Sequence, residues 1–275
     1  GGVYNLGYRI GMIISGSCAI YLSTFISWSS IYRIGALIVA IFSVTLCCFI
    51  ALYQKNHTPA KEDIEAKFSL LSILSLFKHL KSTKAIMIIL VFLILYRLAD
   101  NLISPMMNSF LLQLGYDAFD IATTGKLWGT IGTIIGSFIA TIVMSKITIS
   151  KSLMYFGIIH ALGHICLIIQ YMVGKNYLVL FSTIAIESIS CGMTMSAYMA
   201  LITSLCSGKY RSTQYSILTS MMGISRSTIP AMSGVIVDIF GWQVFFITTI
   251  VLTVPSLMLI PYLTKLPDKK FNEGI

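Results

Sequence analysis

Charged and strongly polar residues interrupt several long apolar runs of this sequence, and their types suit ion and proton chemistry. A charged side chain at the centre of a bilayer costs roughly 3 kcal/mol or more, so it is rarely found there without a partner or a water-filled cavity. Arg97 and Asp100 are three residues apart, which makes them neighbours on one face of a helix. The full set comprises Tyr96, Arg97, Asp100, Asn101, Glu187, Gln214 and Arg226.

The sequence leaves two interpretations of these residues open. In the first, Arg97 and Asp100 form a structural ion pair, and a second such pair joins Glu187 to Arg226. In the second, the residues line a polar cavity between helices, where a proton and a polar solute bind. Asp100 and Glu187 are then the proton carriers, and the two arginines hold an anionic group. The predicted substrate-binding residues are Tyr96, Arg97, Asn101, Gln214 and Arg226.

Two histidines in a later run have a spacing that can hold zinc. His160 and His164 are four residues apart, but no glutamate completes an HExxH motif and no third ligand is within reach on the same helix. The six cysteines also lack a zinc-binding spacing. We therefore expect a buried, hydrogen-bonded histidine pair, or histidines that line a cavity, with no metal and no cofactor.

Enzyme signatures are lacking, because the sequence contains no GxSxG, GxGD or P-loop motif and no convincing Ser–His or Asp–Asp arrangement. We predict that the protein is not an enzyme. Its net charge of +9 does not indicate nucleic-acid binding, because the basic residues lie mostly in loops between apolar runs.

The elements that position these residues are predicted to be membrane-spanning helices. Only 11% of the residues are charged, against about 25% in soluble domains. Several apolar runs reach about 20 residues, the length that crosses a bilayer, where backbone groups must pair within a helix. The fold class is therefore an all-α integral membrane bundle. Its eight predicted spans are residues 6–26, 31–53, 85–110, 121–144, 153–173, 178–206, 214–240 and 244–263.

The loops between the spans predict the orientation. Placing the basic residues 54–84 in the cytoplasm also places there Lys146, Lys151 and the lysines near the end of the chain. The opposite loops then carry Lys175 and acidic Asp117. This is a positive-inside distribution, and it predicts that both ends of the chain are cytoplasmic. Within the central loop, residues 68–80 form an apolar stretch too short to span, which lies on the membrane surface or packs against the protein's own helices.

Small residues and one proline indicate how the spans pack. Glycines recur every three or four residues in the run 121–144, which predicts close helix contact, either as static packing or as a rocking interface. The same holds for Gly7 and Gly11 in the first span. Pro230 is expected to kink the run 214–240, with a structural or gating role left open. The glycines of the longer series are Gly125, Gly129, Gly132 and Gly136.

Several segments resemble the AmpG-type muropeptide permeases of the major facilitator superfamily. The run YRIGMIISGSCAIYLS at residues 8–23 resembles their fifth helix, and LYRLAD at 95–100, followed by GKLWG at 125–129, resembles the start of their carboxyl-terminal half. The strongest part is residues 187–242, with ESISCGM, ALITSLC and STQYSILTSMMGISRSTIPAMSGVIVDIFGW. The resemblance implies a major-facilitator fold in a bacterial inner membrane and proton-driven import of anhydromuropeptides for recycling.

The resemblance also implies a domain plan. Residues 1–53 correspond to the last two helices of the amino-terminal half, 54–84 to the cytoplasmic loop between halves, 85–264 to the six-helix carboxyl-terminal half, and 265–275 to a cytoplasmic tail. Family members have at least twelve helices and bind solute between two six-helix halves. Because only two spans precede the loop and the chain begins without Met, we expect that the first four helices are missing.

Three hypotheses about function follow. The first is a proton-coupled importer of muropeptides, whose partners are membrane lipid, the solute and the proton. The second is a shortened paralogue that does not transport by itself. The third is a transporter of another polar solute such as acetyl-CoA, since acetyl-CoA transporters share the fold and some helix patterns.

Overall fold

The computed structural model describes residues 11, 22, 25–56, 83–206 and 211–264. These residues are overwhelmingly helical, as the apolar runs predict, and the described part contains no β-strand. The chain divides into two units, residues 1–72 and 73–275, which are described separately. The predicted span 6–26 is largely outside the described residues, and the stretch 68–80 and the tail 265–275 are entirely outside them.

The first unit contains one long described helix, α3, from Trp28 to Asn56. It confirms the predicted span 31–53. Large apolar side chains such as Leu37, Phe42 and Phe49 are exposed around it. A helix that is apolar on every side requires a lipid or protein environment rather than water.

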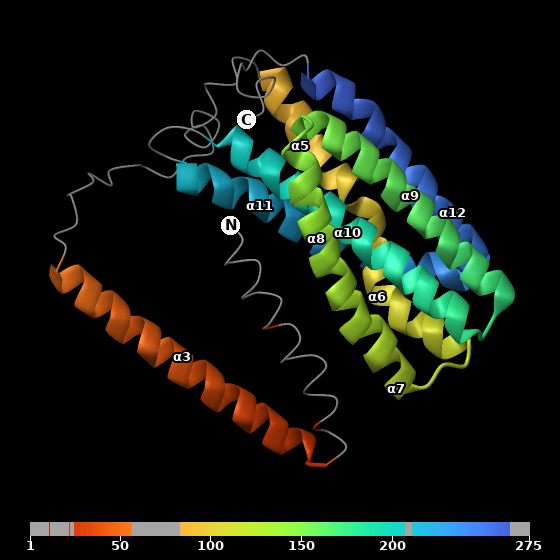
Figure 1. Ribbon diagram of the computed structural model, residues 1–275, viewed down its shortest axis with the longest axis horizontal. Helices are drawn as coiled ribbons and strands as arrows, with labels where there is room; N and C mark the ends of the chain where they lie inside the picture. The colour runs from red at the N-terminus through yellow and green to blue at the C-terminus, as the bar shows by residue number, and fades with distance from the viewer. Residues whose placement is uncertain (1–10, 12–21, 23–24, 57–82, 207–210, 265–275) are drawn as a thin grey trace. The chain divides into compact units, whose positions relative to one another are not determined.

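The second unit is a bundle of helices (Figure 1). Helix α10 packs against both α8 and α9, α9 packs against α12, and α12 also contacts α5 and α6. Helix α11 contacts α5, α6 and α10. The elements are α5 (Thr83–Tyr96), α6 (Leu98–Gln113), α7 (Ala118–Asp120), the π-helix η3 (Ile121–Trp128), α8 (Gly129–Met144), α9 (Ile149–Val173), α10 (Tyr177–Leu205), α11 (Arg211–Thr228) and α12 (Ala231–Thr264).

Within the described residues, six helical stretches are long and apolar enough to cross a membrane. They account for six of the eight predicted spans. The predicted span 214–240 is divided instead, because α11 ends at Thr228 and α12 begins at Ala231, on either side of Pro230. Gly241 then adopts φ +77°, which interrupts α12 between residues 240 and 242. This kink separates the last two predicted spans.

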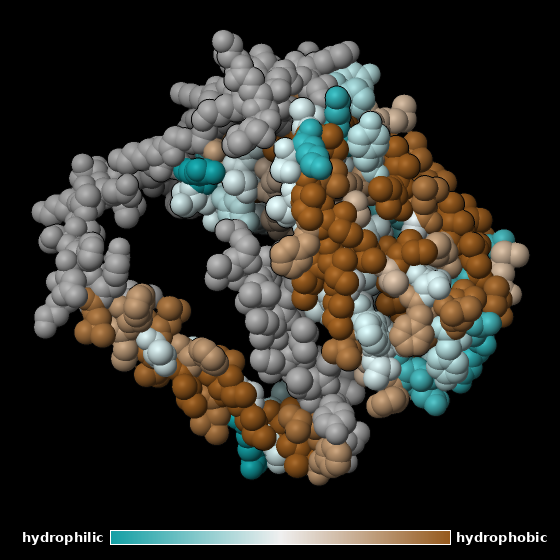
Figure 2. Space-filling view, viewed as in Figure 1, coloured by the Kyte–Doolittle hydropathy of each residue, from teal (hydrophilic) through white to brown (hydrophobic). Residues whose placement is uncertain are grey.

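Apolar side chains face outward over the middle of the bundle. Figure 2 shows hydrophobic residues on the viewed outer face, with hydrophilic residues collected toward the ends. Phe138 on α8, Leu162 on α9 and Met258 on α12 are among the exposed apolar residues. Such a surface matches a hydrocarbon environment, in which polar groups collect at the two interfaces.

The glycines of α8 confirm the predicted close packing. A Cβ atom at Gly132 would lie 2.8 Å from Cβ of Ser188 on α10, and one at Gly136 would overlap the backbone of Ile189. On the facing helix, a Cβ at Gly192 would overlap the backbone of Thr133. Gly125 differs, because its Cβ would meet only the Ile121 side chain of its own helix, at 4.0 Å. Glycine on both sides therefore sets the separation of α8 and α10.

Two apolar clusters fill the bundle at different heights along the helices. One includes Phe92, Phe156, Tyr198 and Leu201. The other includes Leu102, Phe110, Leu167, Ile184 and Trp242. On each of the three spans formed by α5–α6, α9 and α10, the polar residues lie between members of one cluster and members of the other. The interior therefore contains a polar layer between two apolar ones.

Hydrogen bonds at one end of the bundle hold α6, α9 and α10 in register. The hydroxyl of Tyr116, after α6, accepts from Gln170 Nε2 on α9 at 3.1 Å and from the backbone N–H of Asn176 at 2.8 Å. Asn176 in turn caps α10 by accepting from the N–H of Leu178 at 3.0 Å. Trp242 of α12 donates to Gln113 of α6 at 2.6 Å. These contacts position the three helices that supply the polar layer.

Candidate functional site

Four buried or partly buried side chains from three helices converge in the polar layer. Asp100 comes from α6, His160 and His164 from α9, and Glu187 from α10. One nitrogen or oxygen atom from each lies within 4.8 Å of the others. We call these four residues the buried cluster.

Arg97 borders the cluster at a break in the chain's path. Helix α5 ends at Tyr96 and α6 begins at Leu98, and Arg97 between them has φ −103° and ψ 2°, outside the helical range. Its guanidinium forms an ion pair with Asp100, and both side chains are almost fully buried. The predicted local pair is therefore confirmed. Broken helices within membrane proteins are tolerated where they line a protein interior or a cavity.

His160 connects all three helices. Its Nε2 contacts Asp100 Oδ1 on α6, and its Nδ1 lies 2.8 Å from the Ser190 hydroxyl on α10. That hydroxyl donates to the backbone oxygen of Glu187 at 2.9 Å. The sequence predicted a hydrogen-bonded histidine pair. For His160, the hydrogen bonds go to other helices rather than to His164.

His164 and Glu187 form a looser contact. The imidazole of His164 is fully buried, and its Nε2 lies 3.7 Å from Glu187 Oε1, which is longer than a hydrogen bond. Its ring packs edge-on against the ring of His160, with centroids 4.7 Å apart. Within the described part of the chain, neither ring nitrogen of His164 has a hydrogen-bond partner. Buried polar atoms without partners are rare in proteins and point to a functional site.

A glycine on α9 makes room for Glu187. A Cβ atom added to Gly163 would lie 3.1 Å from Glu187 Oε2 and 3.3 Å from Ser190 Oγ. Real Cβ atoms seldom approach other atoms so closely. Gly163 therefore allows the carboxylate to lie against the backbone of α9, beside the histidines.

The other predicted site residues fall in three places. Tyr96 is buried in the apolar cluster next to Arg97, where its hydroxyl donates to the backbone oxygen of Leu153 at 3.0 Å and its ring stacks on Tyr198. Asn101 extends the polar layer to α11, because its Nδ2 donates to Ser225 Oγ at 2.8 Å.

Arg226 and Gln214 both lie on α11, at different heights. Arg226 follows Ser225 directly and is exposed, so it lies next to the residue that Asn101 contacts. Gln214 is buried, but eleven residues before Ser225, which corresponds to roughly 16 Å along the helix. The structure therefore separates Gln214 from the polar layer. Glu187 contacts His164 on α9, a partner that the sequence interpretation did not consider.

The buried cluster is also a donor set that a transition metal could accept. Two imidazoles and two carboxylates suit zinc and its neighbours, and the third and fourth donors that α9 lacks come from α6 and α10. Arg97, however, places a positive charge against one of the two carboxylates. Like charges in a medium of low dielectric constant repel strongly, which opposes a divalent ion here.

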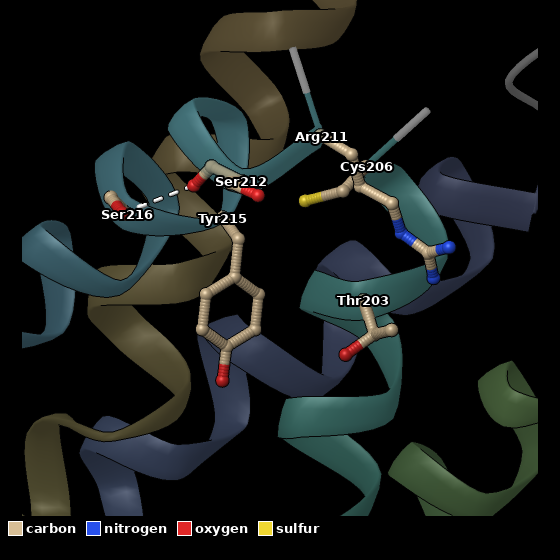
Figure 3. Close-up of a pocket in the computed structure, with 6 residues that line it drawn as sticks. All are labelled: Thr203, Cys206, Arg211, Ser212, Tyr215 and Ser216. Carbon is tan, nitrogen blue, oxygen red and sulfur yellow. Dashed lines mark hydrogen bonds between the residues drawn. The ribbon is translucent and has the colours of Figure 1, made fainter. Parts of the chain in front are cut away.

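A separate pocket lies at the junction of α10 and α11 (Figure 3). Its volume is about 330 Å³. Glu187 precedes Thr203 by sixteen residues on α10, which corresponds to roughly 24 Å along the helix, so the pocket is remote from the buried cluster. It contains none of the predicted site residues. The lining residues are Thr203, Cys206, Arg211, Ser212, Tyr215 and Ser216.

Sequence reasoning missed the part that the histidines and serines play. His160 and His164 carried a usable signal, since two polar residues in an apolar run need partners, but the partners lie 60 and 23 residues away along the chain. Ser190 and Ser225 carried no signal, because serine is common in membrane helices. The break at Arg97 was also missed, since the run contains no proline or glycine there.

The fold and the site define a class of membrane protein. An all-helical bundle with long apolar helices and a buried charged layer is the architecture of a membrane transporter. A family model described as Major Facilitator Superfamily matches residues 1–170 and, in an overlapping match, residues 129–274. The chain belongs to this superfamily.

The chain is similar to several rickettsial proteins. It is 48% identical over 267 residues to "Putative transporter AmpG 1" of Rickettsia conorii and 47% identical over 266 residues to the protein of that name in Rickettsia bellii. It is also 32% identical over 262 residues to "Putative transporter AmpG 4" of Rickettsia felis. These matches cover 94% of this chain, but only 64%, 64% and 63% of the respective relatives.

Proposed function

We propose that this chain forms part of, or acts as, a proton-coupled transporter that imports anhydromuropeptides across a bacterial inner membrane. The observation that carries the proposal is the buried cluster with Arg97, which collects ionisable side chains from three spans of a major-facilitator bundle. Charges in such a position are costly, so they typically mark ion and solute pathways.

The substrate follows from the resemblance to AmpG-type permeases, and the names of the relatives support it. Anhydromuropeptides carry carboxylates, which guanidinium groups bind well. We propose that Arg97 and Arg226 bind an anionic group of the solute, with Tyr96, Asn101 and Gln214 as further contacts. Of these five, Arg97 and Asn101 have the strongest support, because both lie in the polar layer.

Proton coupling is assigned to Asp100 and Glu187. Each carboxylate has a titratable neighbour on α9, because Asp100 contacts His160 and Glu187 Oε1 lies 3.7 Å from His164 Nε2. Substituting Asp100→Asn or Glu187→Gln is expected to reduce proton-driven uptake more than solute binding, because each removes a group that exchanges the proton and leaves its shape in place. Normal transport by both variants would mean that neither carboxylate carries the proton.

Uptake of labelled anhydromuropeptide into membrane vesicles containing this chain tests the proposal. We expect accumulation that depends on an inward proton gradient and that a protonophore abolishes. Vesicles without the chain are the control, and unlabelled acetyl-CoA is the competitor. Displacement by acetyl-CoA, with no effect of unlabelled muropeptide, would assign another solute. An absence of gradient-dependent uptake would favour a shortened protein that does not transport by itself.

A further inference from the structure

We infer that the buried cluster and Arg97 together hold one exchangeable proton, and that this proton is on His160, which lies between Asp100 and Ser190. The inference deepens the proposed function. Its consequence for transport rests on that function, but the protonation state does not. It adds the two histidines and Ser190 to the coupling site, and it states how many protons the site takes.

The hydrogen bonds of His160 place the proton. The Ser190 hydroxyl has one hydrogen, which it donates to the backbone oxygen of Glu187 at 2.9 Å. When the hydroxyl donates to that oxygen, Nδ1 of His160, 2.8 Å from the hydroxyl, is the donor of the second hydrogen bond. Nε2 faces Asp100 Oδ1, and an ionised carboxylate only accepts hydrogen bonds. In this arrangement both ring nitrogens carry hydrogen, which makes His160 an imidazolium.

A count of charges gives the same number independently. With both carboxylates ionised, Asp100 and Glu187 contribute two negative charges and Arg97 one positive charge, so the site has a net charge of −1 when both histidines are neutral. One proton on His160 makes the site neutral, which a poorly hydrated interior strongly favours. A divalent cation would leave it at +1, so the charge balance favours a proton over a metal ion.

The surrounding elements contribute few other charges that would alter this count. Tyr96 on α5, Cys191 and Tyr198 on α10 and His164 on α9 face the same region and are neutral in their ordinary states. Helix α12, which packs against α9, offers buried hydroxyls such as Thr249 and Thr253. On α11, Arg226 is exposed.

The proton has a direct consequence for an anionic solute. When the Nε2–H bond of His160 breaks, its electron pair stays on the nitrogen and the proton passes to water, which returns the site to −1. A negatively charged site repels an anionic solute, whereas a neutral one with Arg97 attracts it. Solute and proton are therefore bound together and released together, one proton for each cycle.

Nitrogen-15 NMR of the histidine-labelled chain in lipid nanodiscs tests the protonation state without requiring transport. The chain has four histidines, and His160→Gln and His164→Gln assign the two buried ones. At neutral pH we expect His160 with both nitrogens protonated and His164 neutral. A neutral His160 would overturn the inference, and so would stoichiometric binding of Zn²⁺ by the purified chain that shifts both histidine signals.

Two further variants separate charge from structure. Asp100→Asn leaves Arg97 and Glu187 balanced, so the imidazolium signal should disappear. Adding Arg97→Gln to Asp100→Asn leaves Glu187 unbalanced, so one imidazolium should return, on His160 or His164. If Asp100→Asn removes the imidazolium signal by damaging the fold, the double variant will show no recovery of that signal. This outcome would contradict the charge count.

The same variants can be followed in vesicles. Asp100→Asn should lower proton-driven uptake by about 5- to 150-fold, the usual range of coupling between two bound ligands, and the double variant should stay low, because it also lacks the Arg97 guanidinium proposed to bind the solute. Absence of uptake by the unaltered chain, with the expected NMR signals, would overturn the proposed function and leave the one-proton site intact. Uptake by the unaltered chain together with a neutral His160 would support the proposed function and overturn the one-proton site.

Discussion

At the scale of single residues, the chemistry depends on atoms that face one another across helices. Asp100 has Arg97 on one side and His160 on the other, so one carboxylate contacts both a permanent charge and the proposed exchangeable one. Ser190 fixes the direction of the His160 ring by lying at its second nitrogen. Gly163 has no side chain, and this leaves room for the Glu187 carboxylate, which a Cβ atom there would crowd.

Replacing Gly163 with alanine tests this contact. The added Cβ would lie 3.1 Å from Glu187 Oε2, so the carboxylate must shift by a few tenths of an ångström from its place beside the histidines. We expect proton-driven uptake to fall by about ten-fold and stability to fall by roughly 1–3 kcal/mol through overpacking. Gly234→Ala on α12 is the control, since nothing lies within 4 Å of a Cβ there. Equal activity of the two variants would show that the Glu187 position is not constrained.

Replacing Ser190 with alanine tests the hydrogen bond to His160. The variant removes the partner of Nδ1 and leaves the backbone of α10 in place. We expect the imidazolium signal of His160 to weaken and the pH profile of uptake to shift. Ser196→Ala is the matched control, because Ser196 makes the same kind of bond within α10, to the oxygen of Gly192 at 2.9 Å. Identical spectra of the two variants would remove Ser190 from the site.

At the scale of elements, the site depends on helices that either break or pack unusually closely. The interruption at Arg97 separates α5 from α6 within one predicted span, and the turn at Pro230 divides α11 from α12. Asn101 and Ser225 join these two irregular spans near the breaks. Helices α8 and α10, in contrast, pack closely at glycines on both helices. Glu187 and Ser190 therefore lie on a firmly packed helix.

Gly136→Ala is expected to disturb this packing. Its Cβ would overlap the backbone of Ile189, which cannot move aside as a flexible side chain can, so the two helices must separate. We predict a loss of stability of roughly 1–3 kcal/mol, measured as a lower temperature of unfolding in detergent. Gly125→Ala, eleven residues earlier on the same span and free of such overlap, should change it much less. Similar losses for both would argue against the interface.

At the scale of the whole molecule, the chain is a major-facilitator protein that spans 64% of the length of its R. conorii relative. Its described helices include the complete set that builds the buried cluster. Transporters of this architecture bind solute between two halves, and the proposed coupling site lies in residues 85–264, which we predict to form the carboxyl-terminal half. The distribution of basic residues between the loops predicts that the end with the basic loops faces the cytoplasm.

The orientation can be measured at the two ends of one span. Ala118 and Ser145 are both exposed and lie at opposite ends of the stretch Ala118–Met144. In intact cells, a membrane-impermeant thiol reagent should label Ala118→Cys, and it should label Ser145→Cys only after permeabilisation. The parent chain, with its native cysteines, is the control. The opposite pattern would reverse the proposed topology.

The sequence by itself determined the class of fold, six of the eight predicted spans and the charged residues that a membrane interior cannot accept singly. A continuous apolar run of bilayer length forms a helix, because its backbone groups must form hydrogen bonds with one another in the hydrocarbon. Arg97 and Asp100 are close because residues three apart lie on the same face of a helix. Only the tertiary structure decided which charges share a site. Helix spacing says nothing about the rotation of α9 against α6 and α10, and that rotation brings His160 to Asp100 and His164 to Glu187. The tertiary structure also separates Gln214 from the buried cluster, because Gln214 lies at a different height in the bundle.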